Sequence, residues 1–331
     1  RYFSWLRGIL GGLWGDFDMG LSRSGIPVTE LLGQAIPVTV KLVITATFLA
    51  IILGVSVGMI TAIRQYSRFD YVMTFFSFLL FSLPIFWVAV LLKEFMAIQF
   101  NDFLADPKIA PTTIALTSLV IGFIMAGFVG GSRRQFFSVI AGGAVFTAAT
   151  LSFMSGSNWF LEPALGIFGV SFLALTSAVI VIQLISGLDN IKGRYAGFGT
   201  AAAIAILYYP LQGLMSEDAS FFNVVAIFVI TISLGMTIRY FVSKIDRRIY
   251  TRIGLFTALL STFPIIIDRF MKEFPGYMNS DAVNGRPVPT LGQNNDMLTP
   301  EQLENFWVSG LDTAAHLVLP TIALTLISFA G

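Results

Sequence analysis

Residues 42–63 read LVITATFLAIILGVSVGMITAI, a run of 22 positions without Asp, Glu, Lys or Arg. A helix needs about 20 apolar residues to cross a bilayer core roughly 30 Å thick. This run therefore predicts a membrane-spanning helix. Eight further stretches without these charged residues follow, at 71–92, 109–132, 135–161, 163–188, 195–216, 219–238, 253–267 and 313–331. The sequence thus predicts an all-α polytopic membrane protein with nine crossings, of which 253–267 is the shortest.

The composition excludes several classes of protein. The chain has 331 residues, 56% hydrophobic and 12% charged, about half the charge of a typical soluble domain. A net charge of +1 gives no surplus for binding nucleic acid. The absence of cysteine and the single histidine, His316, exclude cysteine metal sites and metal sites built from several histidines within this chain. We expect no cofactor.

The distribution of basic residues predicts the orientation, because Lys and Arg are retained on the cytoplasmic side of short connections. The short connections 156–162 and 215–220 contain no basic residue. The other set of connections contains eleven of the twenty: Arg64, Arg68, Arg133, Arg134, Lys192, Arg194, Arg239, Lys244, Arg247, Arg248 and Arg252. We therefore place this second set in the cytoplasm, and segments 1–41 and 268–312 outside.

The two outer segments have different patterns. Residues 1–37 begin as an amphipathic element that includes Trp5 and Trp14 and then become rich in turn residues. Residues 271–312 predict a long irregular loop and then a short helix, with Thr299 as the cap and Pro300 in the first turn. We further expect a helix to precede Arg1 and the last helix to continue past Gly331.

Two small motifs lie within the first two stretches. Gly54 and Gly58 form G-x-x-x-G, which favours close helix packing, either within this chain or against another subunit. Pro84 interrupts the second stretch and predicts a kink. Ser82, Pro84, Phe86 and Trp87 are the candidate residues of a translocation pathway, although proline kinks also occur in membrane helices that line no pathway.

The charged residues give no sign of ion coupling. Asp268 and Arg269 fall at a predicted outer end, where we expect their side chains to reach the interface. Ion-coupled carriers tend to place carboxylates at mid-membrane, and none is predicted there. No G-x-x-x-x-G-K-[ST] phosphate loop is present, so the chain is expected not to be an enzyme.

A further set of residues is specific when its members are taken together. It comprises Asp16-Phe17, Gly20, Ser22 to Val28, Leu31-Leu32, Pro37-Val38-Thr39, Leu49-Ala50, Gly54, Gly58, Ala62, Ser67, Asp70, Ser82 to Trp87, Leu91-Leu92 and His316 to Leu324. This pattern, which covers about 1–112 and 305–331, resembles the permease subunits of bacterial dipeptide/oligopeptide ABC importers.

The resemblance implies a transmembrane permease subunit of an ATP-driven importer in the bacterial plasma (inner) membrane, which forms part of a peptide pathway by alternating access. It implies four kinds of partner: a homologous second permease, two cytoplasmic ATP-binding subunits, an external solute-binding protein and the peptide substrate. The loop that docks on the ATPase in this family would lie beyond Gly331.

One departure from the family pattern is large, because about six extra hydrophobic stretches lie between the helix containing Trp87 and the helix containing His316. Since six is even, the insertion would begin and end outside. The expected organisation is an external segment and entry to the core at 1–41, core helices and an outer loop at 42–108, inserted helices at 109–267, an external loop at 268–312 and the start of a further core helix at 313–331.

Other functions remain open. The chain could be an ion-coupled secondary transporter or channel, which an inverted repeat would favour. Within the ABC class, the solute could instead be nickel, glutathione, haem or an oligosaccharide. A membrane-embedded enzyme would need clustered acid, base or metal-ligand groups, for which the sequence offers few candidates.

Overall fold

The computed structural model describes residues 2–12, 18–129, 131–242 and 247–330, so that the predicted interfacial Trp14 and the basic Lys244 lie outside the described residues. In these ranges the regular elements are helices, and the one β-bridge joins Leu21 and Pro27. The predicted all-α class is confirmed. The chain forms two compact units, the first of Arg1–Ile98, Thr290–Gln293 and His316–Gly331, and the second of Gln99–Pro289 and Asn294–Ala315.

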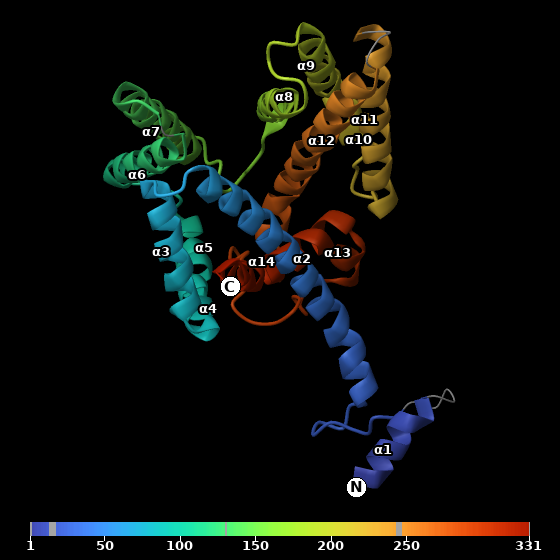
Figure 1. Cartoon of the computed structure of the whole chain (residues 1–331). Helices are drawn as coiled ribbons and strands as arrows, with labels where there is room; N and C mark the ends of the chain where they lie inside the picture. The colour runs from blue at the N-terminus through green and yellow to red at the C-terminus, as the bar shows by residue number, and fades with distance from the viewer. Residues whose placement is uncertain (1, 13–17, 130, 243–246, 331) are drawn as a thin grey trace. The chain divides into compact units, whose positions relative to one another are not determined.

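The first unit contains the N-terminal helices and the end of the last one (Figure 1). Its elements are α1 (Tyr2–Gly11), α2 (Val28–Ile63), α3 (Arg68–Ser82), α4 (Ile85–Leu92), the π-helical segment η2 (Lys93–Ile98) and the second half of α14 (Phe306–Ala330). Helix α1 coincides with the predicted amphipathic element. In the turn that precedes α2, Gly25 has φ +80°, a left-handed conformation that suits glycine.

Helix α2 is longer than the sequence pattern indicates, because it begins at Val28 rather than near residue 42. Its 36 residues span about 54 Å, well beyond a bilayer core of roughly 30 Å. Pro37 lies inside the helix, and the Thr39 hydroxyl donates to the Ala35 carbonyl at 2.9 Å in the same turn. The lipid can therefore enclose only part of α2 unless the helix is strongly tilted.

The predicted kink at Pro84 is a complete break. Helix α3 begins after Ser67, whose hydroxyl accepts from the Asp70 amide at 3.2 Å, and it ends at Ser82. Helix α4 begins directly after Pro84, and the helical directions on the two sides of the break differ by 103°. The predicted single crossing at 71–92 is therefore a bent pair of helices. Pro84 has no N–H to donate, and the chain turns at this point.

The second unit contains a helical hairpin and a larger bundle. Its elements are α5 (Gln99–Ala105), α6 (Pro111–Val129), α7 (Arg133–Gly156), α8 (Gly166–Ile185), α9 (Ile191–Ile206), α10 (Tyr208–Gly213), α11 (Phe221–Val242), α12 (Arg247–Met278), α13 (Pro300–Glu304) and the first half of α14. Helices α6 and α7 pack closely on each other, since a Cβ added at Gly143 would lie 3.2 Å from the Gly122 Cα. Small residues permit this approach of two backbones.

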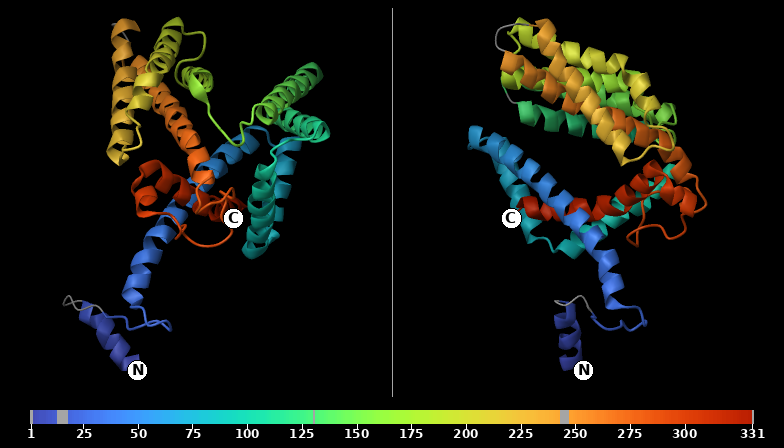
Figure 2. Two further views of the ribbon diagram at one scale, coloured as in Figure 1. Left: turned by 180° about the vertical axis from the view of Figure 1, so that it is seen from behind. Right: turned by 90° about the vertical axis from the view of Figure 1, so that its right-hand side faces the viewer.

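Helix α12 is the central element of the bundle, which also contains α8, α9 and α11 (Figures 1 and 2). Half of its most apolar window is buried, compared with 28% or less for the other candidate spans. The backbones of α11 and α12 touch, because a Cβ added at Gly235 would clash with the Gly254 carbonyl oxygen. The Thr231 and Thr262 hydroxyls lie 2.7 Å apart in the same interface.

The contacts along α12 fix the direction of its neighbours. Near its start, Ile253 lies close to Gly193 and Gly197 of α9. Toward its end, Asp268 contacts Tyr208 of α10 and the start of α8. Helices α9 and α10 therefore run together in the direction of α12, while α8 and α11 run against it. The starts of α9 and α12, with their predicted cytoplasmic basic residues, lie at the same end of the bundle.

The number of crossings differs from the predicted nine. Seven of the described helices are long and apolar enough to span a membrane, namely α2, α6, α7, α8, α11, α12 and α14, and the bent α3–α4 pair would be an eighth. The predicted crossing at 195–216 is instead divided between the 16-residue α9 and the short α10. The stretch 253–267, predicted to be the shortest, is the middle of the 32-residue α12.

Candidate functional site

The predicted pathway residues lie at the break between α3 and α4. The Ser82 hydroxyl donates to the Leu79 carbonyl at 2.8 Å, so it closes the last turn of α3. The amide of Trp87 donates to the Pro84 carbonyl at 2.9 Å and begins α4. The side chains of Phe86 and Trp87 are 68% and 46% exposed. The break therefore presents two large aromatic groups that the described part of the chain does not cover.

A groove lies next to this break, within the first unit. It has a volume of about 460 Å³, and α2 contributes Gly54, Gly58 and Thr61 to its wall. Helix α3 contributes Ser77 and Phe81, and the end of α14 contributes Phe329. A Cβ added at Gly54 or Gly58 would meet no atom within 4 Å among the described residues. The predicted close packing at these glycines is thus not made inside the described chain, and a contact with another subunit remains a prediction.

The groove and the candidate pathway residues are adjacent in the structure but do not form one site. Phe81 lines the groove, whereas Ser82, Pro84, Phe86 and Trp87 are not part of its wall. The hydroxyls of Thr61, Thr74 and Ser77 give the groove hydrogen-bonding positions within an otherwise apolar wall. Walls of this kind are typical of sites that bind solutes through shape and a few polar groups.

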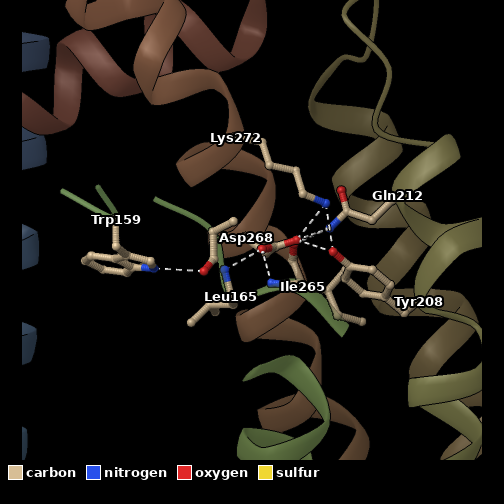
Figure 3. A network of polar contacts seen from close by, with 9 residues as sticks. Trp159, Leu165, Tyr208, Gln212, Ile265, Asp268 and Lys272 are labelled. Carbon is tan, nitrogen blue, oxygen red and sulfur yellow. Dashed lines mark hydrogen bonds and ion pairs between the residues drawn. The ribbon is translucent and has the colours of Figure 1, made fainter. Parts of the chain in front are cut away.

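A second arrangement of polar groups surrounds Asp268, which is fully buried (Figure 3). One carboxylate oxygen accepts from the amides of Leu165 and Gly166, each at 2.8 Å. The other accepts from the Tyr208 hydroxyl at 2.5 Å and the Gln212 side chain at 3.0 Å. Lys272 completes the set as an ion pair at 2.9 Å, and its ammonium also donates to the Tyr208 hydroxyl at 2.7 Å.

This geometry corrects the interfacial role predicted for Asp268. The carboxylate receives five donors, so its hydrogen-bonding capacity is filled and it is not open to a passing proton or solute. It joins the start of α8, the short α10 and the outer part of α12. Arg269, predicted to behave in the same way, forms an ion pair with Glu273 and places its guanidinium 5.8 Å from the centre of the Trp307 ring. The described Asp268 cluster is therefore a structural junction.

The same junction reaches α14. Trp307 is fully buried and donates its indole N–H to the Ser216 carbonyl at 3.0 Å. Its ring packs edge-on against Phe270 of α12, with 4.9 Å between ring centres. One turn further along α14, the carboxylate of Asp312 accepts from the Tyr277 hydroxyl at 3.1 Å. The first half of α14 is thus held against the end of α12 and the segment after α10 by Trp307 and Asp312.

Two signals in the sequence point to this junction. Asp268 and Lys272 have the i,i+4 spacing of a helical ion pair. An ionisable residue that ends a long apolar run is also a candidate for a paired, buried position. Sequence reasoning missed Tyr208, Gln212 and Trp307, because their contacts join segments far apart in the chain. Among the described residues, no group of three or more Asp, Glu or His side chains is arranged to hold a metal ion.

Comparison with known proteins gives permease proteins of transport systems among the relatives of this chain. The chain is 26% identical over 203 residues to the oligopeptide transport system permease protein AppB of Bacillus subtilis, a match that covers 56% of this chain and 63% of that protein. It is 28% identical over 203 residues to the OppB permease of the oligopeptide transport system of Salmonella typhimurium, covering 58% and 65%. Over 95 residues it is 35% identical to the putrescine export system permease protein SapB of Escherichia coli, covering 28% of each chain.

The matched region spans less than two thirds of the length of these relatives. No protein-family model matches the chain, and no solved structure does. The predicted relationship to peptide-transport permeases is nevertheless confirmed, and the seven helices capable of crossing a bilayer agree with a multi-pass membrane protein.

Proposed function

From the relationship of this chain to the permease proteins of oligopeptide transport systems, we propose that it is a membrane subunit of an ATP-driven importer and forms part of the pathway for peptides. The observation that carries the proposal is the 203-residue similarity to AppB and OppB. The broken α3–α4 pair and the groove beside it supply the kind of surface that a solute pathway needs. We place the protein in the bacterial plasma membrane.

The mechanism we propose is alternating access. The outer segments 1–37 and 271–312 would receive the solute from an external binding protein. A second, homologous permease would complete the pathway. The face of α2 with Gly54 and Gly58 is suited to such a contact, because a Cβ there meets no described atom within 4 Å and small residues let helices approach closely. Two cytoplasmic subunits would hydrolyse ATP.

Cysteine substitution tests the pathway directly, because the chain contains no cysteine of its own. Single variants Ser82→Cys, Phe86→Cys and Trp87→Cys would be treated with a water-soluble thiol reagent in membranes that contain the assembled transporter. We expect reaction at these positions and protection by peptide substrate. The control Val145→Cys replaces a 69% exposed side chain in the middle of α7, which we expect to face lipid and to stay unreactive.

A transport assay separates this proposal from its rivals. Vesicles with the complete complex should take up peptide only when ATP is supplied to the ATPase side. Uptake driven by a proton or sodium gradient by this chain alone would establish a secondary transporter instead. Competition by nickel, glutathione, haem, oligosaccharide or putrescine would identify a different solute within the same class.

A further inference from the structure

The second unit contains a cavity whose wall includes neither the Asp268 junction nor the residues at the break between α3 and α4. It has a volume of about 470 Å³ and is lined by three segments that are distant in sequence. These are α5 with Asp102, the link between α7 and α8 with Glu162, and the end of α12 with the following loop, which contributes Asn279, Asn284 and Arg286. By the predicted topology it opens to the outside, and we name it the outer pocket.

The walls of the outer pocket are fixed by specific contacts. Asn101, only 6% exposed, donates its side-chain amide to the Val288 carbonyl at 2.8 Å and accepts from the Val288 amide at 3.1 Å. This pair of bonds holds the loop after α12 against α5. Phe103 and Phe160 meet edge to face with ring centres 5.0 Å apart, which holds the α7–α8 link against the same helix. The pocket therefore has a preformed shape.

The charges in the pocket do not cancel. Arg286 pairs with Asp102 at 2.7 Å, so these two groups neutralise each other. The exposed carboxylate of Glu162 lines the same cavity and makes no ion pair or side-chain hydrogen bond with the described residues. The pocket thus carries one unbalanced negative charge. The side-chain amides of Asn279 and Asn284 line the same cavity and supply donors and acceptors.

We propose that the outer pocket binds the primary ammonium group of an extended solute. Glu162 pairs with the ammonium, and the amides of Asn279 and Asn284 bond to the polar groups next to it. A cavity of this size falls within the range of small-molecule sites. A peptide N-terminus and a free polyamine share this chemistry. The identification of the ammonium group as a peptide N-terminus rests on the proposed function, whereas the proposal that the pocket binds an ammonium group does not.

The test measures binding to the full chain in lipid nanodiscs by isothermal titration calorimetry. The probes are trialanine, N-acetyl-trialanine and putrescine. For trialanine, we expect acetylation of the N-terminus and Glu162→Gln each to weaken binding about fivefold, the size expected for a partly exposed ion pair. Glu162→Asp keeps the charge and should retain most of the affinity. Glu217→Gln, at an exposed carboxylate outside the pocket, should leave it unchanged.

Each outcome decides the proposal. Tighter binding of trialanine than of its acetylated form, lost in Glu162→Gln, supports a peptide N-terminus. Binding of putrescine alone, with the same dependence on Glu162, supports the ammonium site and identifies a polyamine. If none of the three probes binds, or if the wild-type and Glu162→Gln proteins bind with equal affinity, the proposed ammonium site is wrong. ATP-driven peptide uptake is measured separately. The transport assay can therefore refute the proposed function while the binding assay supports the ammonium site, and the binding assay can refute the site while the transport assay supports the function.

Discussion

Asp268 shows what a buried charge requires in this protein. Removing a carboxylate from water costs several kcal/mol, which is recovered only when hydrogen bonds and an opposite charge replace the lost water. Asp268 has both, from two backbone amides, Tyr208, Gln212 and Lys272. The donors come from three different helical segments and meet at one carboxylate, so the loss of that carboxylate affects all of them. We therefore expect the junction to fail as a unit.

The variant Asp268→Asn should destabilise the protein by about 3–5 kcal/mol, because it removes the charge and leaves buried donors facing an amide. The free energy of unfolding in mixed detergent micelles measures this effect. Asp281→Asn makes the same chemical change at an exposed position just after α12 and should alter stability by less than about 0.5 kcal/mol. Equal stability of the two variants would contradict the role of Asp268.

A second prediction at this scale concerns Trp307. Trp307→Phe keeps an aromatic ring against Phe270 but loses the bond to the Ser216 carbonyl, so we expect a loss of about 1 kcal/mol. Trp307→Ala also empties a fully buried site and should cost about 3–5 kcal/mol. The same unfolding measurement distinguishes the two. If both variants cost the same, the packing of the ring contributes nothing.

At the scale of the helix, the closest contact in the bundle is the meeting of α11 and α12. Glycine is needed on both sides, because the added Cβ at either Gly235 or Gly254 would strike the backbone of the other helix. Lipid is as apolar as the helix surfaces, so close backbone packing stabilises helix association in membranes. The hydroxyls of Thr231 and Thr262 add a hydrogen bond to the same interface.

We expect Gly235→Ala to destabilise the bundle by about 1–3 kcal/mol through overpacking. Gly142→Ala on α7 is the matched control, because a Cβ there meets no atom within 4 Å. It should stabilise its helix by about 0.5–1 kcal/mol through the higher helix propensity of alanine. The measurement is thermal unfolding followed by circular dichroism in detergent. A stabilising Gly235→Ala would refute the close contact.

Some elements follow from local sequence and others do not. The cap at Thr299 was predictable because it needs only nearby residues, and its hydroxyl does accept from the Gln302 amide at 3.3 Å, with Pro300 in the first turn. The first turns of α2 were not predictable, since Pro37 and Lys41 resemble a helix boundary in the sequence. The division between α9 and α10 was also missed, because Tyr208 and Gln212 of α10 contact Asp268 far along the chain.

At the scale of the whole molecule, the direction of the helices agrees with the distribution of charge. The starts of α9 and α12 lie at the same end of the bundle, and both carry basic residues of the predicted cytoplasmic set. Seven of the described helices, or eight with the bent α3–α4 pair, are apolar and long enough to cross a membrane, compared with the nine predicted. Hydropathy located the apolar stretches because it reflects the solvent around the helices, but it did not show where a stretch is divided. The contacts of Asp268 were not predicted, because they depend on the folded arrangement of the chain. Its hydrogen-bond partners Leu165, Gly166, Tyr208 and Gln212 lie between 56 and 103 positions away in the sequence.

Labelling of whole cells tests this orientation. Arg133→Cys and Arg247→Cys should react with a membrane-impermeant thiol reagent only after the membrane is opened, because short basic connections are retained in the cytoplasm. Asp281→Cys, in the predicted outer loop, should react in intact cells. Labelling of Arg133→Cys or Arg247→Cys from the outside would contradict the predicted topology. It would also contradict the outward opening assigned to the cavity near Glu162.

The position of the partners of Asp268 along the chain has a consequence for biosynthesis. The residues that donate to it from other helices, Leu165, Gly166, Tyr208 and Gln212, all precede it and leave the ribosome first. Lys272 follows one helical turn later. Four of the five donors to the carboxylate are therefore synthesised before it and are available when its helix enters the membrane. The order of synthesis thus favours insertion of Asp268 with hydrogen-bond donors already present.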